Sequence, residues 1–301
     1  MLLLQLQDGP MPLMLDDTAD VLTMLLRRQV EHRPACDYLI TTQRGGGIDA
    51  TMRRRIAAWM VDVATEFRFT VDETVDLALN YLDRYLSQVT TTKHELQLVG
   101  LAALLVASKF LETDALLMAE AAEMAKVAGF TPARIQAAEL ALLRALDWNL
   151  HVVLPVHFVD LFVADLHIPT LHNTTRALLA ANRLSYTLLA FPPSHVATAV
   201  VALACHLTGH PASAFATYLV DKALPAADHT CQRHLLHGYD TAAGRSASSP
   251  PPIKRDRSPS PVGVDDDLFE SITFDMTPPP TTHAVVPQVK RAKPNVAAVA
   301  E

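Results

Sequence analysis

The run from Leu96 to Glu112, LQLVGLAALLVASKFLE, constrains the fold more than any other part of the sequence. Its first twelve residues are apolar except for Gln97, so a helix formed by them has no polar face. A helix that is apolar all round is buried on all sides. Twelve residues fall well short of the ~20 that a membrane-spanning helix needs. The run therefore predicts the central core helix of a soluble helical domain, with Lys109 as a charge at its end.

Composition and charge limit the kinds of partner. The chain has 301 residues, of which 50% are apolar, enough for two domains with aliphatic cores. Residues 1 to 240 hold 18 Lys and Arg against 25 Asp and Glu. A nucleic-acid-binding domain normally carries a basic surface. We therefore expect no nucleic-acid partner, and the N-terminus lacks the pattern of a secretory signal, so we expect no membrane partner.

Three cysteines, Cys36, Cys205 and Cys231, are far apart and form no CxxC motif. This usage is typical of a reducing compartment.

Apolar residues recur at helical spacing along most of the chain, and no segment shows the alternation of a strand. Thr70 and Glu73 predict a capping box, Gly129 a helix end, and Thr131 with Pro132 a helix start. In the helix from Met52, Arg53 and Arg54 fall on the polar side. The predicted helices cover 17–31, 52–67, 71–86, 96–112, 115–127, 131–147, 156–165, 171–189, 194–207, 212–219 and 230–237.

Changes in composition divide the chain into four parts. We expect a flexible N-terminus at 1–15, a helical domain with a preceding helix at 16–152, a second helical domain at 153–240, and a tail at 241–301. Ten of the twenty prolines lie in the tail, together with many Ser, Thr and Asp residues. Such a segment cannot bury enough apolar surface to offset the entropy lost on ordering, so the tail is predicted to be disordered.

No catalytic motif is present. The glycines at 45–47 lack the spacing of a phosphate-binding loop, and no serine lies in a nucleophile elbow. The densest set of possible metal ligands matches no standard zinc spacing. It consists of His229, Cys231, His234 and His237. We therefore expect no enzyme activity, no metal and no cofactor.

Lys109 and Glu139 are each a lone charge in an apolar helix. Lys109 has a possible partner in Glu112, three residues on and on the same helix face. The two charges could instead pair with each other inside the monomer. The third alternative is that they are polar anchors at the mouth of an apolar groove, which bind another protein.

Four ordered blocks resemble the cyclin box, and D-type cyclins most of all. They are MRRRIAAWMVDV from Met52, NYLDRYLS from Asn80, the buried run from Leu96, and AELALLRALDWNL from Ala138. The resemblance implies an all-α protein with two consecutive five-helix cyclin folds and an N-terminal helix. It also implies a regulatory subunit that binds and activates a cyclin-dependent serine/threonine kinase at cell-cycle entry, with Lys109 and Glu139 gripping the kinase and Glu112 beside them.

The resemblance further implies a docking patch for kinase substrates and inhibitors. Its members here are Met52, Trp59, Asp62, Leu96 and Gln97. Arg55 occupies a position that is usually aliphatic in the family, so the patch departs from the family pattern. Met52 and Trp59 are equally compatible with places in the core.

Both ends of the chain also bear on regulation. The segment from Leu4 to Asp8 lacks the cysteine and glutamate of the LxCxE motif with which D-type cyclins bind retinoblastoma-type proteins. In the tail, Thr277, Ser258 and Ser260 each precede a proline and are candidate phosphorylation sites. Two short basic runs in the tail and the family resemblance predict localisation to nucleus and cytoplasm.

Other functions remain compatible with the residues. A cyclin of transcriptional or metabolic type would share the fold. A general-transcription-factor-like cyclin fold would bind nucleic acid, against which the acidic charge argues. A helical enzyme would have to use an unrecognised site, such as the cluster from His229 to His237.

Overall fold

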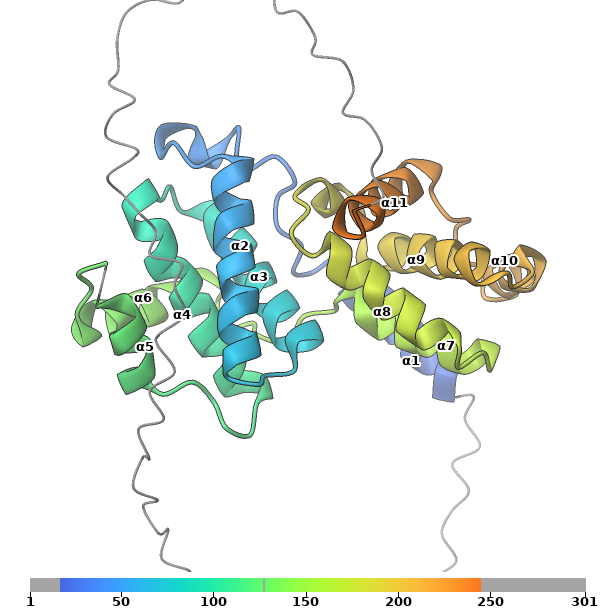
Figure 1. The fold of residues 1–301 in the computed structure, drawn as a ribbon, viewed down its shortest axis with the longest axis horizontal. Helices are drawn as coiled ribbons and strands as arrows, with labels where there is room; N and C mark the ends of the chain where they lie inside the picture. Colours follow the sequence, from blue (N-terminus) through green and yellow to red (C-terminus); the bar gives the residue numbers. More distant parts are fainter. Residues whose placement is uncertain (1–16, 127, 245–301) are drawn as a thin grey trace, which may run out of the picture.

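A computed structural model describes residues 17–126 and 128–244, and within these ranges the chain forms helices and loops without strands. Several predictions lie outside the described residues. They concern the flexible N-terminus, residues 245–301 of the disordered tail, the LxCxE-like segment, the basic runs, and Thr277, Ser258 and Ser260. Figure 1 shows the order of the helices along the chain. They are α1 (Asp17–Arg28), η1 (Thr42–Gly45), α2 (Ala50–Glu66), α3 (Val71–Gln88), α4 (Lys93–Leu111), α5 (Met118–Ala125), α6 (Pro132–Ala145), α7 (Pro155–Leu166), α8 (Leu171–Asn182), η2 (Thr187–Ala190), α9 (Pro193–Thr208), α10 (Ala212–Asp221) and α11 (His229–Ala242).

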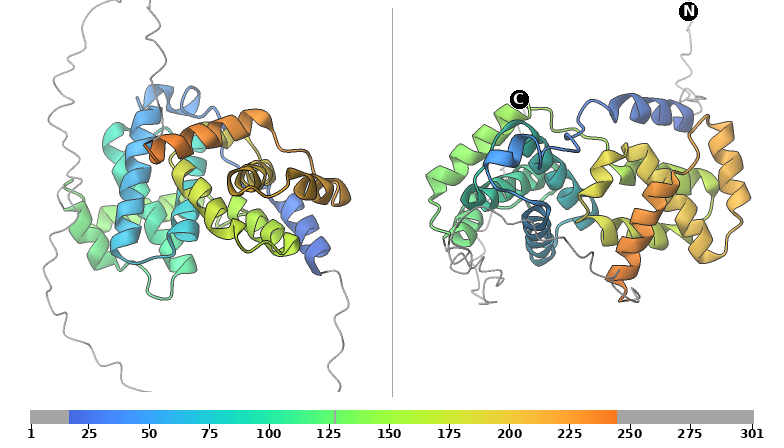
Figure 2. Two further views of the ribbon diagram at one scale, coloured as in Figure 1. Left: turned by 45° about the vertical axis from the view of Figure 1, so that its right-hand side comes forward. Right: turned by 90° about the horizontal axis from the view of Figure 1, so that it is seen from above.

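The helices form two bundles, α2 to α6 and α7 to α11, each around its own apolar core. The first bundle lies on the left of Figure 1 and the second on the right. Helix α1 packs against α7, with Leu22 and Leu25 buried in the second core, and Figure 2 shows it along the outer side of that bundle. The predicted all-α architecture, two five-helix units preceded by one helix, is confirmed.

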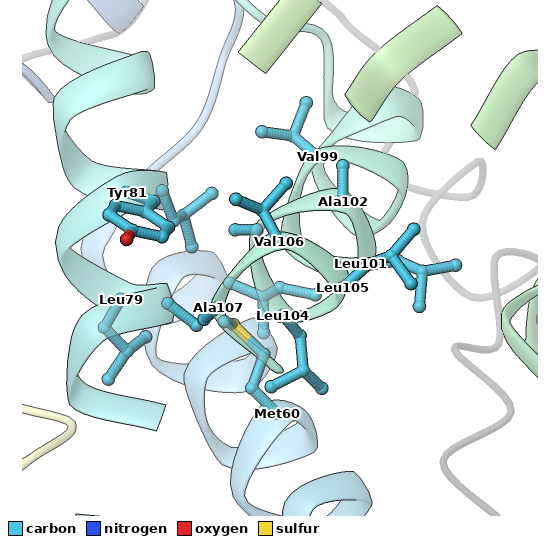
Figure 3. Close-up of a cluster of buried hydrophobic side chains, with 14 of the residues drawn as sticks. Met60, Leu79, Tyr81, Val99, Leu101, Ala102, Leu104, Leu105, Val106 and Ala107 are labelled. Atoms are coloured by element: carbon cyan, nitrogen blue, oxygen red, sulfur yellow. The ribbon is translucent and has the colours of Figure 1, made fainter. Parts of the chain in front are cut away.

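Helix α4 is the centre of the first bundle. Every residue from Leu98 to Ser108 is buried, and α4 packs against α2, α3 and α6. Figure 3 shows its side chains between Met60 of α2 and Tyr81 of α3. Among the described helices α4 alone has the length and apolar composition of a membrane span, and its position identifies it as a core helix.

Gly100 explains how closely α2 approaches α4. A Cβ atom at Gly100 would lie 2.7 Å from Cγ1 of Ile56, nearer than side-chain atoms normally approach. The absence of a side chain therefore lets the two helices pack with Ile56 over the backbone of α4.

Several predicted helix ends agree with the structure. Thr131 caps α6, with its hydroxyl accepting from the Arg134 N–H at 3.3 Å, and Pro132 occupies the first helical position. Gly129 has the predicted left-handed φ, at 75°, but it does not cap α5, which ends at Ala125 with Lys126 as its C-cap. Other helices differ from the prediction at their ends, since α1 stops at Arg28 and α5 covers Met118–Ala125. The predicted start of the disordered tail at residue 241 is wrong, because α11 continues to Ala242.

The helix predicted at 171–189 is wrong, because α8 ends at Asn182. The Asn182 side chain is buried and donates to the carbonyls of Leu178 and Leu235, both at 2.9 Å. Beyond it the chain turns toward the first bundle, where Tyr186 packs edge-on against Tyr38. Contacts with another bundle, which helical periodicity does not encode, therefore end α8.

Arg53 is buried, so its assignment to the polar side of α2 is wrong. Its guanidinium forms two bonds of 2.8 and 2.6 Å to Asp83 of α3, and it also donates to the Leu184 carbonyl. Tyr38 donates to the same carboxylate at 2.7 Å. Burial raises the pKa of Tyr38, and the charge of Asp83 raises it further, so the hydroxyl keeps its proton and remains a donor.

A second polar link joins the bundles. Arg183, at the end of α8, donates to Asp76 at 2.6 Å and to Asp72 at 2.7 Å, and both acceptors lie on α3. Arg33, in the segment that follows α1, donates to the carbonyls of Leu189 and Ala190. The relative position of the two bundles therefore depends on specific hydrogen bonds as well as on apolar contact.

Candidate protein-binding site

Lys109 and Glu139 meet at the surface of the first bundle. The Lys109 Nζ lies 2.5 Å from Oε1 of Glu139, and the pair joins the C-terminal end of α4 to the middle of α6. The Lys109 side chain is 45% exposed and that of Glu139 is 14% exposed. Of the alternatives that the sequence left open, the structure shows the two charges pairing inside the monomer while the lysine remains accessible.

The packing of α4 against α6 positions this ion pair. Leu105 of α4 and Leu142 of α6 are both fully buried in the core that the two helices share. Ser108, which is fully buried, accepts a hydrogen bond from the Leu116 N–H at 3.2 Å and so holds the turn that follows α4. The backbone under Lys109 is therefore fixed, and the lysine reaches outward from a rigid support.

Glu112 binds a different element. Its Oε1 accepts from the Thr70 N–H at 2.7 Å and from the Thr74 hydroxyl at the start of α3. The predicted capping box of Thr70 and Glu73 is therefore wrong, because a carboxylate from a distant helix end takes the position of the local cap. Glu112 also makes no ion pair with Lys109, so it serves to connect α3 with the end of α4.

Exposed apolar side chains follow the ion pair directly in the sequence. Phe110 and Leu111 come after Lys109, Leu140 comes after Glu139, and Leu117 precedes α5. Their exposed fractions are 44%, 41%, 38% and 62%. Exposed apolar residues that neighbour an accessible charge in the sequence are typical of a protein-binding surface. The sequence pattern does not single out these four residues, because apolar residues in a predicted helix are expected to be buried.

The residues of the predicted docking patch differ in how far they are buried. Met52, Trp59 and Leu96 are buried, with Trp59 9% exposed. Gln97 is partly buried and Asp62 is exposed. The apolar members thus belong to the core of the first bundle in this structure, and the exposed part of α2 presents Asp62 together with Arg55.

The described residues contain no group of three His, Cys, Asp or Glu side chains arranged to hold a metal ion. The cluster from His229 to His237 lies on α11, where Cys231 is fully buried. Burial raises the pKa of the Cys231 thiol to about 12, and the charge of Asp228 raises it as well. Cys231 is therefore a buried, neutral thiol in the core of the second bundle.

Comparison with known proteins gives two family matches. Residues 20–151 match the model described as cyclin, N-terminal domain, and residues 153–245 match that described as cyclin, C-terminal domain. The G1/S-specific cyclin-D3 of Bos taurus is 35% identical over 201 residues, which are 65% of this chain and 67% of the relative. The G1/S-specific cyclin-D2 of Xenopus laevis is 33% identical over 197 residues, 64% of this chain and 66% of the relative.

Among solved structures, the X-ray structure of a viral cyclin from herpesvirus saimiri superposes with a TM-score of 0.63. The alignment covers 74% of this chain and 97% of the viral protein, at 19% sequence identity. This likeness shows that the arrangement of the two helical bundles is shared.

Proposed function

This chain belongs to the cyclin family, and from that premise we propose that it is a regulatory subunit that binds and activates a cyclin-dependent serine/threonine kinase at the G1/S transition. The observation that carries the proposal is the ion pair between the accessible Lys109 and the partly buried Glu139, with exposed apolar residues next to both in the sequence. The names of the relatives, G1/S-specific cyclins D3 and D2, favour this timing over a transcriptional or metabolic role.

Activation requires no catalytic group from the cyclin. A protein kinase becomes active when a glutamate on its regulatory helix pairs with a lysine of its ATP site. A rigid surface that holds this helix inward stabilises the active arrangement. The buried α4 supplies that rigidity, the apolar side chains beside Lys109 supply contact area, and Lys109 and Glu139 can exchange their mutual ion pair for bonds to the kinase.

The test uses a panel of purified cyclin-dependent kinases and the full-length chain. Lys109→Ala or Glu139→Ala is expected to weaken kinase binding at least about tenfold, because losing one partner of a desolvated charged contact costs ~2–5 kcal/mol. Titration calorimetry and kinase activity are the measurements. Arg134→Ala is the matched control, since Arg134 pairs with Glu95 across the same two helices at a different position.

A charge exchange separates binding from support of the fold. The double variant Lys109→Glu with Glu139→Lys can restore the ion pair between α4 and α6. If the two side chains bind the kinase individually, the exchange leaves kinase binding lost although thermal stability returns. Recovery of binding in the exchanged variant would show that the pair acts only inside the monomer, and would remove this site from the proposal.

We further propose roles for the other predicted sites. Gln97, Asp62 and the edge of Trp59 would contact substrates or inhibitors, and Arg55 would select the charge of what docks there. Phosphorylation of Thr277, Ser258 or Ser260 would add nearly two negative charges to the tail at each site. Localisation to nucleus and cytoplasm would follow from the kinase partnership and the basic runs of the tail.

A further inference from the structure

Three arginines at one end of α2 are exposed and have no ionic partner. Arg54 and Arg55 lie in the second turn of α2, and Arg44 lies in η1, just before that helix. None of them makes an ion pair or side-chain hydrogen bond with the residues that the structure describes. We call these three residues the α2 basic patch. Figure 1 shows η1 at the upper end of α2, on the front of the first bundle.

The sequence of α2 leaves this charge unshielded. Acidic residues three or four positions away on a helix would neutralise it. At those positions Arg54 and Arg55 have only Ala, Thr, Met and Trp residues. The exposed acids of α2, Asp62 and Glu66, lie about two turns or more toward the other end. The start of α2 therefore carries Arg54 and Arg55 against one acid, the N-cap Asp49, whose side chain accepts from the Met52 N–H. The other end of α2 carries only acids, in a described region whose charge is negative overall.

The chain carries a segment with complementary charge. Residues 258–289 contain five acidic residues and no lysine or arginine. Three of the acids are consecutive, Asp265 to Asp267, and Leu268 and Phe269 follow them directly. An exposed apolar side chain, Ile40, which is 75% exposed, lies four residues before Arg44 and could contact such a segment.

We propose that the acidic segment from Asp265 to Glu270 docks on the α2 basic patch of its own chain. Twenty residues separate it from Gly244, the last described residue, and these can span up to ~65 Å. That reach exceeds the diameter of a domain of this length, so the linker allows the acidic segment to reach the α2 basic patch. Charge complementarity then favours the patch as its binding site. Tethering gives the segment an effective concentration near the millimolar range, which makes a weak contact sufficient.

Occupation of the patch would regulate docking, and this consequence rests on the proposed function. Arg55 lies beside Met52 and Trp59 on the helix, at the edge of the predicted docking patch. A tail segment held there would exclude acidic partners and would compete with substrates that use the same face. The docking of the segment itself does not require a kinase and can be tested without one.

The test places the photo-crosslinking amino acid p-benzoylphenylalanine at Phe269 of the full-length chain. After irradiation at ~50 mM salt, mass spectrometry is expected to find cross-links concentrated in residues 40–62. The double variant Arg54→Glu with Arg55→Glu should reduce them at least about fivefold, because each attraction becomes a repulsion. The control is Arg27→Glu with Arg28→Glu, an adjacent arginine pair on α1, which should leave the cross-links unchanged.

A variant in which the charge of the tail segment is reversed completes the experiment. Replacing Asp265, Asp266 and Asp267 by Lys in the Arg54→Glu, Arg55→Glu variant should restore the cross-links. Melting temperatures measured on each variant show whether the fold is intact. Cross-links spread over the surface, equal losses in the α1 control, or no recovery with the reversed tail would overturn the proposal. Cross-linked dimers in place of intramolecular products would overturn the assignment to the same chain.

Discussion

At the scale of single residues, the structure separates three charged groups that the sequence placed together. Lys109 pairs with Glu139 at 2.5 Å, whereas Glu112 binds Thr70 and Thr74. The two arrangements imply different consequences of mutation. Lys109 and Glu139 should affect partner binding, and Glu112 should affect the stability of the first bundle.

Glu112→Ala removes two hydrogen bonds between the end of α4 and the start of α3. We expect it to lower the free energy of unfolding by about 1–2 kcal/mol, the usual range for charge-assisted bonds that are partly exposed. Urea denaturation provides the measurement. Glu112→Gln retains a carbonyl acceptor and should lose less stability than Glu112→Ala. Kinase binding should fall less in either Glu112 variant than in Lys109→Ala. Equal stability of Ala and wild type would show that these bonds contribute nothing.

His157 should make stability depend on pH. Its Nδ1 accepts from the Leu154 N–H at 3.2 Å, and burial lowers the pKa of His157 below its usual value. The charges that face it are those of Glu73, Asp160, His151 and Arg176. Because the unfolded chain then binds the proton more readily, the stabilisation is complete above about pH 6.5 and is lost as the pH falls toward the folded-state pKa.

The measurement compares wild type with His157→Gln by thermal unfolding between pH 7.5 and pH 5. Glutamine can accept the same backbone bond but does not titrate. Wild type should therefore lose more stability on acidification than the variant. Parallel curves would exclude His157 as a source of the pH dependence.

At the scale of elements, α4 was the most predictable helix, because its apolar run requires burial on all sides. Its close contact with α2 was not predictable. In the sequence, Gly100 indicates only a position that destabilises a helix. The structure shows that Ile56 packs against it. The sequence contains the glycine but not the identity of the residue that packs against it.

Gly100→Ala should destabilise the first bundle by about 1–3 kcal/mol, the usual cost of overpacking a core. This outcome is opposite to the gain expected from replacing glycine by alanine in an exposed helix. Chemical denaturation is the measurement, with Gly45→Ala as control, because a Cβ at Gly45 meets no atom within 4 Å. Adding Ile56→Val should cost less in the Gly100→Ala background than in wild type, and simple additivity would contradict a direct clash.

At the scale of the whole molecule, two polar contacts hold the bundles in one arrangement. Arg53 and Asp83 link α2, α3 and the Leu184 carbonyl, and Arg183 links α8 to α3. All of these contacts join residues at least 30 positions apart. The position of the second bundle relative to the Lys109 and Glu139 pair therefore depends in part on a few long-range bonds.

Arg183→Gln should weaken the coupling of the bundles, because it leaves Asp72 and Asp76 without their principal cation. We expect a loss of about 2–3 kcal/mol, less than for a fully buried pair since both carboxylates are partly exposed. Differential scanning calorimetry should show the second bundle unfolding earlier and separately. Lys222→Gln, which removes an ion pair with Asp165 inside the second bundle, should leave the coupling intact. A single unshifted transition in Arg183→Gln would contradict this role.

For the part of the chain that the structure describes, the sequence alone determined the all-α class, the number of α-helices and most of their starts. These depend on local periodicity, on caps such as Thr131 with Pro132, and on the apolar run that becomes α4. It also identified Lys109 and Glu139 as unusual charges, and the family resemblance paired them. Local signals suffice here because each acts within one or two helical turns.

The tertiary structure decided which distant groups meet. Thr70 receives its cap from Glu112, Arg53 becomes buried because Asp83 satisfies it, and α8 ends at Asn182 because the following segment crosses to the first bundle. It also decided that Phe110 and Leu140 stay exposed beside the ion pair. Hydrogen bonding and burial between segments far apart in sequence depend on three-dimensional placement, which no single helical pattern contains.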